Sequence, residues 1–407
     1  MRDAPPVRWL SILGIGEDGV EGMSAAARLL LGEAALVVGG ARHLALAAPL
    51  IRGEQMVWPS PMGGAVAGIL ARRPQPVVVL ASGDPFSDGV GTMLASVIPV
   101  EAFLCLPAPS AFSWALSRLG WAMRQVATIS FCGRPMAALA PLLQPGRKIL
   151  ALSADAATPA VLAEYLVRRG FGPSRLHIME ALGGPRERVR VTTAENFGLD
   201  DCYKLNLVAI EVAAGDNARV IPLTSGLPDE MFEHDGQITK REIRAVTLAA
   251  LAPCAGECLW DIGCGSGSVA IEWMLRHPDN IAYGIESDAT RAARIAQNAV
   301  NFGVPGLAIV QGRAPEILVG LPVPDAVFLG GGAHLPCVIE AAWEALRQGG
   351  RMVANGIVIE TEAMLFAARE KFGGTLTRLS VERLDKIGGL HGFRPGMTVT
   401  QWSAVKP

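Results

Sequence analysis

Short apolar runs alternate with amphipathic stretches along the whole chain, and this pattern predicts an α/β protein. The runs are about four to eight residues long and end in glycine or small polar residues, as strands buried inside a parallel sheet do. In the first half the predicted strands are 9–16, 35–38, 76–81, 126–131, 148–152, 175–179, 188–192 and 205–212. In the second half they are 257–262, 281–285, 308–311, 326–329 and 351–354. With helices between them, the second group predicts a doubly wound sheet.

Helical periodicity is clear in four segments. They are 24–31, 110–119, 158–169 and 237–251. In the last of these, Thr239 is the predicted N-cap, and Glu242 three residues later would complete a capping box. We expect this helix to begin the second half of the protein.

The chain is too long for one ordinary domain, since 407 residues suit two domains of about 200. The stretch 215–236 contains Pro222, Pro228 and glycines and has no periodic apolar face, so it is the predicted linker. We place the boundary near residue 218, which gives domains 1–217 and 218–407. The two parts carry different glycine signatures, so we expect two different folds.

The most informative stretch follows the strand predicted at 257–262. Glycines alternate at Gly263, Gly265 and Gly267, and Asp261 stands two residues before the first of them. Such a turn lets backbone N–H groups approach a ligand closely. Glu286 comes 23 residues after Gly263, at the tip of the next strand. A carboxylate there suits ribose hydroxyls, and we expect it to lie near solvent.

The spacing of these glycines separates two kinds of nucleotide site. A dinucleotide site prefers G-x-G-x-x-G, but position 268 is a serine. The observed G-x-G-x-G with its preceding acid resembles the glycine loop of Rossmann-like S-adenosylmethionine (SAM) methyltransferases. The alternative is an ordinary tight turn, which the register of Asp261 and Glu286 disfavours.

A second candidate loop lies in the first half, where the strand at 76–81 runs directly into Ser82-Gly83-Asp84-Pro85. Loops at the carboxyl ends of strands in open α/β sheets commonly bind ligands. The Asp84 carboxylate suits an amine group of a ligand. The alternative is an Asx-turn in which Asp84 caps its own loop.

The first 210 residues resemble the tetrapyrrole methylase family, in which two α/β lobes hold SAM in the cleft between them. The matching pieces are LGIG (13–16), VVGGARHL (37–44), ASGDPFSDGVG (81–91) and EALGGPRE (180–187). The chain departs from the family at 17–19, where Pro and Gly are usual. The resemblance implies SAM contacts at Gly14, Gly16, Gly83, Asp84, Ser110 and Ala111.

Residues 222–407 resemble the decarboxylating precorrin methyltransferase domain. Five pieces occur in order, namely TKREIR (239–244), DIGCGSG (261–267), YGIES (283–287), QGRAPE (311–316) and DAVFLGGG (325–332). One departure is Arg313, where an acidic residue is common. The resemblance implies SAM contacts at Thr239, Asp261, Gly263, Cys264, Gly265, Ser266, Gly267, Glu286 and Ala314.

Together the two resemblances imply a multifunctional enzyme of cobalamin biosynthesis with two SAM sites, one in each domain. The first domain would methylate carbon 5 of a precorrin macrocycle. The second would methylate carbon 15 and remove the carboxyl group of the ring C acetate. The glycines at 330–332 leave room for a flat macrocycle and offer no side-chain acceptor for an amine.

The substrate carries several carboxylates, so cationic side chains are candidates for binding it. They are Lys240, Arg241, Arg313 and Lys386 in the second domain and Arg42 and Arg134 in the first. For each of these residues, the alternative interpretation is an ordinary surface charge in contact with solvent. His234, His334 and His391 are candidate proton donors, and the sequence names no catalytic residue.

Composition narrows the partners. With 36 Lys and Arg against 38 Asp and Glu and no basic run, nucleic acid is not expected as a partner. The longest candidate for a membrane span, 102–117, contains two prolines, so no span is expected. Seven cysteines without a C-x-x-C pair indicate reduced thiols in a cytoplasmic protein and no metal site.

We also expect a homo-oligomer. The alternative functions are a methyltransferase acting on another substrate such as RNA and a SAM-sensing scaffold without turnover.

Overall fold

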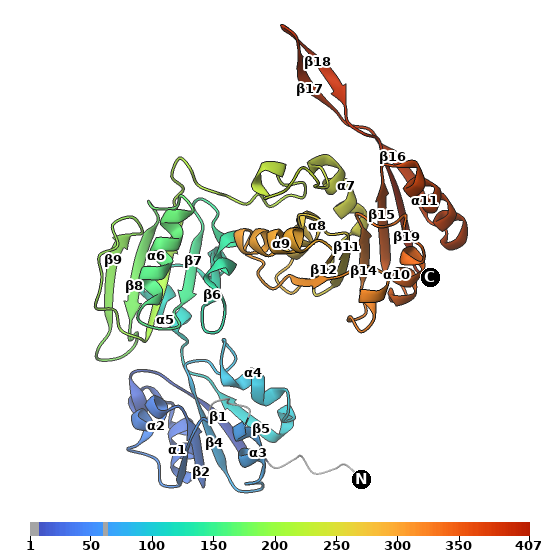
Figure 1. Ribbon diagram of the computed structural model, residues 1–407. Helices are drawn as coiled ribbons and strands as arrows, with labels where there is room; N and C mark the ends of the chain where they lie inside the picture. The colour runs from blue at the N-terminus through green and yellow to red at the C-terminus, as the bar shows by residue number, and fades with distance from the viewer. Residues whose placement is uncertain (1–7, 60–63) are drawn as a thin grey trace. The chain divides into compact units, whose positions relative to one another are not determined.

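The protein, seen here in a computed structural model, forms two compact units. The structure describes residues 8–59 and 64–407. One unit comprises Met1–Met136 with Gln144–Arg219, and the other Ala137–Leu143 with Val220–Pro407. The mixed α/β class predicted from the sequence is confirmed (Figure 1). Among the described residues, no helix has both the length and the apolar character needed to cross a membrane.

The first sheet of the first unit is parallel, with strand order β3-β2-β4-β1-β5. Its strands are β1 (Leu10–Ile15), β2 (Leu36–Gly39), β3 (Glu54–Val57), β4 (Val77–Ser82) and β5 (Phe103–Leu106). The accompanying helices are α1 (Ala25–Glu33), α2 (Ala41–Ala47), α3 (Gly64–Leu70) and α4 (Val90–Ala95). The central strands are buried on both faces, in two separate apolar clusters. This burial explains their continuous apolar runs.

The second sheet of this unit is mixed, with strand order β6-β7-β10-β8-β9. Its strands are β6 (Val126–Ser130), β7 (Lys148–Leu152), β8 (Arg175–Glu180), β9 (Arg188–Thr193) and β10 (Asn206–Glu211). Its helices are α5 (Ala111–Leu119) and α6 (Thr158–Arg168). Only β6 and β7 pair in parallel, and the other neighbours are antiparallel.

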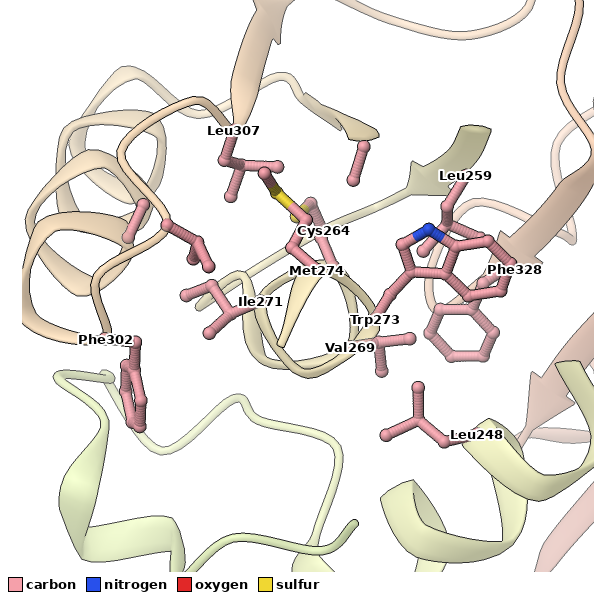
Figure 2. Close-up of a cluster of buried hydrophobic side chains, with 14 of the residues drawn as sticks. Leu248, Leu259, Cys264, Val269, Ile271, Trp273, Met274, Phe302, Leu307 and Phe328 are labelled. Atoms are coloured by element: carbon pink, nitrogen blue, oxygen red, sulfur yellow. The ribbon is translucent and has the colours of Figure 1, made fainter. Parts of the chain in front are cut away.

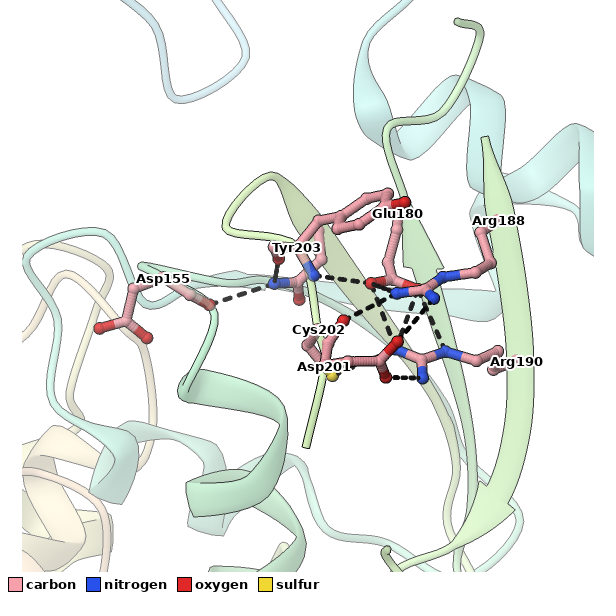
Figure 3. Close-up of polar contacts among 8 residues, drawn as sticks. Asp155, Glu180, Arg188, Arg190, Asp201, Cys202 and Tyr203 are labelled. Carbon is pink, nitrogen blue, oxygen red and sulfur yellow. Dashed lines mark hydrogen bonds and ion pairs between the residues drawn. The ribbon is translucent and has the colours of Figure 1, made fainter. Parts of the chain in front are cut away.

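A buried carboxylate holds one end of this second sheet together (Figure 3). Glu180, at the end of β8, accepts hydrogen bonds from Arg188 Nε at 2.7 Å and from Tyr203 N at 2.7 Å. Arg190 approaches the same carboxylate, and Asp201 contacts both arginines. Two cations thus face two carboxylates, so the cluster is balanced in charge and fixes the β9–β10 connection to β8.

The second unit contains a seven-stranded sheet of order β13-β12-β11-β14-β15-β19-β16. The five strands predicted from the sequence are β11 (Cys258–Ile262), β12 (Ile281–Glu286), β13 (Ala308–Gln311), β14 (Ala326–Leu329) and β15 (Arg351–Gly356). The remaining strands are β16 (Thr375–Leu379), β19 (Val399–Val405) and the separate hairpin β17 (Glu382–Ile387) and β18 (Leu390–Pro395). The helices are α7 (Arg241–Leu251), α8 (Ser268–Met274), α9 (Ala289–Asn301), α10 (Val338–Ala345) and α11 (Ile359–Phe372).

Two apolar clusters cover the two faces of this sheet, as a doubly wound arrangement requires. Successive residues of β11 belong to different clusters, Leu259 to one and Trp260 to the other. Figure 2 shows Trp273 of α8 beside Leu259 and Phe328 in the first cluster. Alternate side chains of one central strand therefore build two cores.

A fully buried ion pair joins the linker to this core. Arg244 of α7 donates from Nε to Glu272 of α8 at 2.6 Å. The Glu272 carboxylate also accepts from the backbone N–H groups of Gly226 and Leu227, at 2.7 and 2.9 Å. Arg244 contacts Asp229 as well, at 3.2 Å. One pair of charges thus fixes residues 226–229 against α7 and α8.

The same arginine explains a wrong prediction at the start of α7. The helix begins at Arg241, with Lys240 as an N-cap that makes no side-chain capping bond, so the capping box at Thr239 is wrong. The carbonyl oxygen of Thr239 instead accepts from Arg244, and the Glu242 side chain pairs with Arg383 of β17. A side-chain contact between residues five apart thus takes the place of the predicted cap.

The buried Asp261 connects the end of β11 to α8. Its Oδ2 accepts from Ala270 N at 3.0 Å and from the Cys264 thiol at 3.3 Å, while Oδ1 is buried with no partner among the described residues. Burial raises the pKa of Asp261 to about 7, partly offset by these two hydrogen bonds, and Glu286 adds to the rise. The glycine loop is therefore anchored by a group that titrates near neutrality.

We predict that Glu272→Gln lowers the stability of the second unit by about 3–5 kcal/mol, because Arg244 is then buried without its counter-charge. Hydrogen exchange of α7 and α8 amides measures this effect. The control is Glu340→Gln, which removes an exposed pair with Lys371 and should cost about 0–1 kcal/mol. Equal effects of the two substitutions would contradict the role given to the buried pair.

We also predict that the second unit loses stability as pH rises from about 4 to about 7. Over this range the folded protein holds a proton on Asp261 that the unfolded chain has released, so raising the pH favours unfolding. Asp261→Asn, which cannot ionise, should flatten this slope. Hydrogen exchange of α8 amides at several pH values, in both proteins, measures the difference, and an unchanged slope would refute the assignment.

Candidate active site in the second unit

A cavity of about 1000 Å³ opens at the carboxyl ends of the parallel strands of the second unit. Loops after β11, β12, β13, β14 and β15 line it. The segment 236–243, which includes the start of α7, and residues near the base of the β17–β18 hairpin complete the wall. This is the edge at which ligands bind in open α/β sheets.

Close backbone packing explains why glycines occupy two of these loops. Gly263 has φ of +72°, and a Cβ there would lie 2.7 Å from backbone atoms of Gly331. Any side chain at 263 would therefore push apart the loops that follow β11 and β14. Gly265 has φ of +63° but more space, and its backbone faces the cavity.

Glu286 lines the cavity, but it is buried, so the expectation that it lies near solvent is wrong. Its Oε2 accepts from Gly265 N and its Oε1 from Asp288 N, both at 2.9 Å. Each carboxylate oxygen has a second lone pair that can accept from a ligand hydroxyl. The carboxylate therefore both shapes the glycine loop and faces the cavity.

The structure brings most of the predicted SAM contacts of this unit together in the wall of the cavity. Those in the wall are Thr239, Gly263, Cys264, Gly265, Ser266, Glu286 and Ala314. Asp261 and Gly267 are not in it, and Asp261 lies behind the loop. Ser266 Oγ is buried without a partner in the described part of the chain, which fits a polar ligand in the cavity.

The predicted substrate-binding cations divide in the same way. Lys240 and Arg313 line the cavity, and so does His334. Arg241 donates to the carbonyl oxygen of Gly226 at 2.9 Å and is not in the wall. Lys386 lies on the hairpin strand β17 and His391 on β18. These two residues and His234 are not part of the cavity wall. The cavity thus combines a nucleotide-type loop with positive charge.

Sequence reasoning missed Asn355, which also lines the cavity. Its Nδ2 donates to Thr247 Oγ1 at 2.9 Å, and its Oδ1 accepts from Gln401 Nε2 at 2.9 Å. These bonds hold the amide rigidly across from the glycine loop. Its position at the carboxyl end of the strand predicted at 351–354 was the available signal.

In the first unit, three loops meet at the carboxyl edge of the parallel sheet. Gly83 N donates to the carbonyl oxygen of Ile15 at 3.2 Å, and Ala108 N donates to that of Gly83 at 3.1 Å. A Cβ at Gly14 would lie only 2.0 Å from the Gly83 oxygen. The loops carrying the predicted contacts at Gly14, Gly16, Gly83 and Asp84 are therefore adjacent.

Several predicted residues of this unit have local structural partners. Asp84 Oδ1 accepts from Phe86 N at 2.8 Å, which is the Asx-turn of the alternative interpretation. Ser110 caps α5 through Ser113 N at 3.2 Å, and Ala111 is the first helical residue. Arg134 is exposed, with Asp88 at 3.8 Å. Arg42 is engaged by Glu17, His43 and Ser82.

Two family models match the chain, one over each part. Residues 10–198 match the Tetrapyrrole (Corrin/Porphyrin) Methylases. Residues 230–406 match the Precorrin methyltransferase domain.

Proteins of related sequence extend these matches. A Sinorhizobium protein named precorrin-6Y C(5,15)-methyltransferase (decarboxylating) is 54% identical over 98% of this chain and 96% of its own length. A Saccharolobus solfataricus protein, "Probable cobalt-precorrin-6B C(15)-methyltransferase (decarboxylating)", is 38% identical over 38% of this chain and 79% of its own. The crystal structure of the C-terminal domain of precorrin-6Y C5,15-methyltransferase from Rhodobacter capsulatus is 42% identical, covering 46% of this chain and all of that one, with a TM-score of 0.44. The chain therefore belongs to the family of decarboxylating precorrin-6Y C(5,15)-methyltransferases.

Proposed function

We propose that this protein methylates carbons 5 and 15 of a precorrin macrocycle with SAM and removes the carboxyl group of the ring C acetate, in cobalamin biosynthesis. The observation that carries the proposal is one chain matching tetrapyrrole methylases over 10–198 and a precorrin methyltransferase domain over 230–406. The name of the Sinorhizobium relative, which aligns along almost the whole chain, covers both methylations and decarboxylation.

The domain 218–407 is assigned the reactions at carbon 15 and the acetate, and the domain 1–217 the methylation of carbon 5. The Saccharolobus relative supports this division. Its name describes methylation at carbon 15 with decarboxylation, and 79% of its length aligns with only 38% of this chain. Both reactions suit one pocket. Methylation changes the ring conjugation close to the acetate, and an adjacent imine can accept the electron pair that carbon dioxide leaves behind.

In the second domain, the glycine loop and Glu286 are assigned to SAM, which supplies a methyl group on a positively charged sulfur. The Glu286 carboxylate would accept from the ribose hydroxyls with its remaining lone pairs. The buried Ser266 hydroxyl would pair with a polar group of the same ligand. These residues bind and orient the donor, while the chemistry resides in its sulfonium.

The positively charged wall is assigned to the macrocycle. Lys240 and Arg313 would pair with its carboxylates, and both face the same cavity as the glycine loop. His334, in the same wall, is the candidate that returns a proton to the carbon from which carbon dioxide departs.

The first domain is assigned its own SAM site, at the three adjoining loops that carry Gly14, Gly83 and Asp84. Their mutual contact supports this assignment, since a Cβ at Gly14 would clash with the Gly83 backbone.

We also propose a homo-oligomer that works in the cytoplasm. The β17–β18 hairpin projects from its sheet (Figure 1). Its exposed residues Leu384, Ile387, Leu390 and Phe393 form a surface that a second copy would cover.

We predict that Glu286→Gln weakens SAM binding to the second domain by about 1.5–3 kcal/mol, roughly ten- to hundredfold, because a charged acceptor is lost. Calorimetry measures the affinity. Since Gly265 and Asp288 also bond this carboxylate, hydrogen exchange should report a loss of loop stability as well. Glu344→Gln, exposed on α10, is the charge-matched control. An unchanged affinity would remove Glu286 from the site.

We predict that Gly265→Arg abolishes methylation at carbon 15 and release of carbon dioxide while leaving methylation at carbon 5. The arginine would project into the cavity and displace SAM from the second domain only. Mass spectrometry of the product from SAM and the precorrin measures methyl gain and carbon dioxide loss, and calorimetry should fall from two SAM per chain to one.

The matched control is Gly320→Arg, which has the same left-handed backbone, with φ of +85°, but lies outside the cavity wall. It should behave as wild type. If Gly265→Arg releases carbon dioxide at the wild-type rate, the assignment of that reaction is wrong. A wild-type chain that binds SAM without changing the mass of the precorrin would favour a SAM sensor.

A further inference from the structure

Four polar side chains converge at the carboxyl edge of the first parallel sheet, where none was predicted to act in catalysis. Glu17 follows β1, Arg42 and His43 begin α2 directly after β2, and Ser82 ends β4. Ser82 also immediately precedes Gly83 and Asp84, so the cluster adjoins the loops assigned to SAM. Chain segments 25 and 40 residues apart thus supply one site.

The hydrogen bonds of this cluster define the state of the imidazole. His43 Nε2 lies 2.8 Å from Ser82 Oγ and 2.9 Å from Arg42 Nη2. Because an arginine only donates, Nε2 must carry the lone pair, and in the neutral ring the proton is on Nδ1. Arg42 Nη2 also donates to Ser82 Oγ at 2.8 Å, which leaves the serine hydroxyl proton free to point at Nε2.

The surroundings keep this histidine neutral. Burial, and then the charge of Arg42, lower the pKa of His43 to about 4, and Glu17 opposes them. Glu17 in turn pairs with Arg42 and, at 3.4 Å, with Arg186. The imidazole therefore presents an unprotonated Nε2 at every physiological pH, next to a serine that is exposed to solvent.

Two simpler roles fit this geometry poorly. A carboxylate-binding site would need a guanidinium whose donors are free to meet the ligand, but Arg42 already donates to Glu17, His43 and Ser82. A purely structural histidine would have both ring nitrogens satisfied, but His43 Nδ1 is buried with no partner among the described residues. The contact that points to a base is at the other ring nitrogen, where Ser82 Oγ lies 2.8 Å from Nε2.

The proposed reaction of this domain requires such an acceptor. When a ring carbon that carries hydrogen gains a methyl group, its π electrons form the new C–C bond and the methyl–sulfur pair stays on sulfur. The ring is left positively charged. Breaking the C–H bond at that carbon returns an electron pair to the ring, and one proton must leave. Because this restores conjugation to a cation, a weak base is sufficient.

We propose that His43 Nε2 accepts this proton through the Ser82 hydroxyl, and that Arg42 is the positioning residue that orients both. The inference rests on the proposed methylation at carbon 5 by the first domain. It assigns to the cluster a role in proton removal that is separate from SAM binding.

The test uses the full-length protein with His43→Gln. The glutamine amide lies near the position of the imidazole Nε2 but is not a base. With SAM and the precorrin, methylation at carbon 5 should slow by about 10²–10⁴-fold. Methylation at carbon 15, release of carbon dioxide and calorimetric SAM binding should match wild type. With substrate deuterated at carbon 5, the variant should show a primary isotope effect that wild type lacks, because proton removal becomes rate-limiting.

The control is His177→Gln, which changes a histidine of β8 that pairs with Glu211 at 2.8 Å, away from the cluster. It should methylate carbon 5 at the wild-type rate. Wild-type kinetics in His43→Gln, or a slow variant without the isotope effect, would overturn the proposal. Failure of the proposed function is distinguishable, since wild type itself would then add no methyl group at carbon 5.

A second measurement needs no substrate. In proton NMR of the full-length protein, the His43 ring resonance, assigned by its loss in His43→Gln, should not titrate between pH 5.5 and 8. Ser82→Ala should leave that resonance in place yet slow methylation at carbon 5. A His43 resonance that titrates near the ordinary pKa of histidine, about 6.5, would overturn the proposal.

Discussion

The buried pair between Arg244 and Glu272 is the interaction on which the second unit most depends. Two charges removed from water are stable only when each is fully paired, and here the remaining hydrogen-bonding groups are satisfied by the backbone of the linker. That requirement fixes residues 226–229, holds α7 against α8 and keeps Thr239 outside the helix. The segment 236–243 can then form one wall of the cavity, next to the glycine loop.

Much of the fold could be predicted because buried parallel strands leave a strong signal. The run at 326–329 coincides with β14, whose four residues are all buried, since apolar side chains there fill both faces of the sheet. Strands that are exposed on both faces left no such signal. The strand β3 is mostly exposed, and β17 and β18 are almost wholly so, which means that their polar residues resemble those of loops. The start of α7 was missed because the carbonyl oxygen of Thr239 accepts from the Arg244 side chain, a bond that the residue pattern does not reveal.

The candidate site was predictable to the extent that it depends on backbone geometry. Alternating glycines with an acid on the following strand indicated the cavity, because only glycine tolerates the left-handed turns there. The different roles of Asp261 and Glu286 could not be read from spacing, since one lies behind the loop and the other in the cavity wall. The pairing of His43 with Ser82 was also invisible, because it joins segments that meet only after the sheet has formed.

The contact between Gly263 and Gly331 is one-sided, and this asymmetry bears on how the pocket could evolve. A side chain at 263 would collide with backbone at 2.7 Å, whereas a Cβ at 331 would have ordinary contact, its nearest neighbour being Gly263 Cα at 3.7 Å. The loop assigned to the donor is therefore locked, while the facing loop after β14 has steric freedom. A substitution at 331 could therefore change which macrocycle accepts the methyl group without disturbing the loop that binds the methyl donor. One scaffold could in this way serve differently substituted macrocycles.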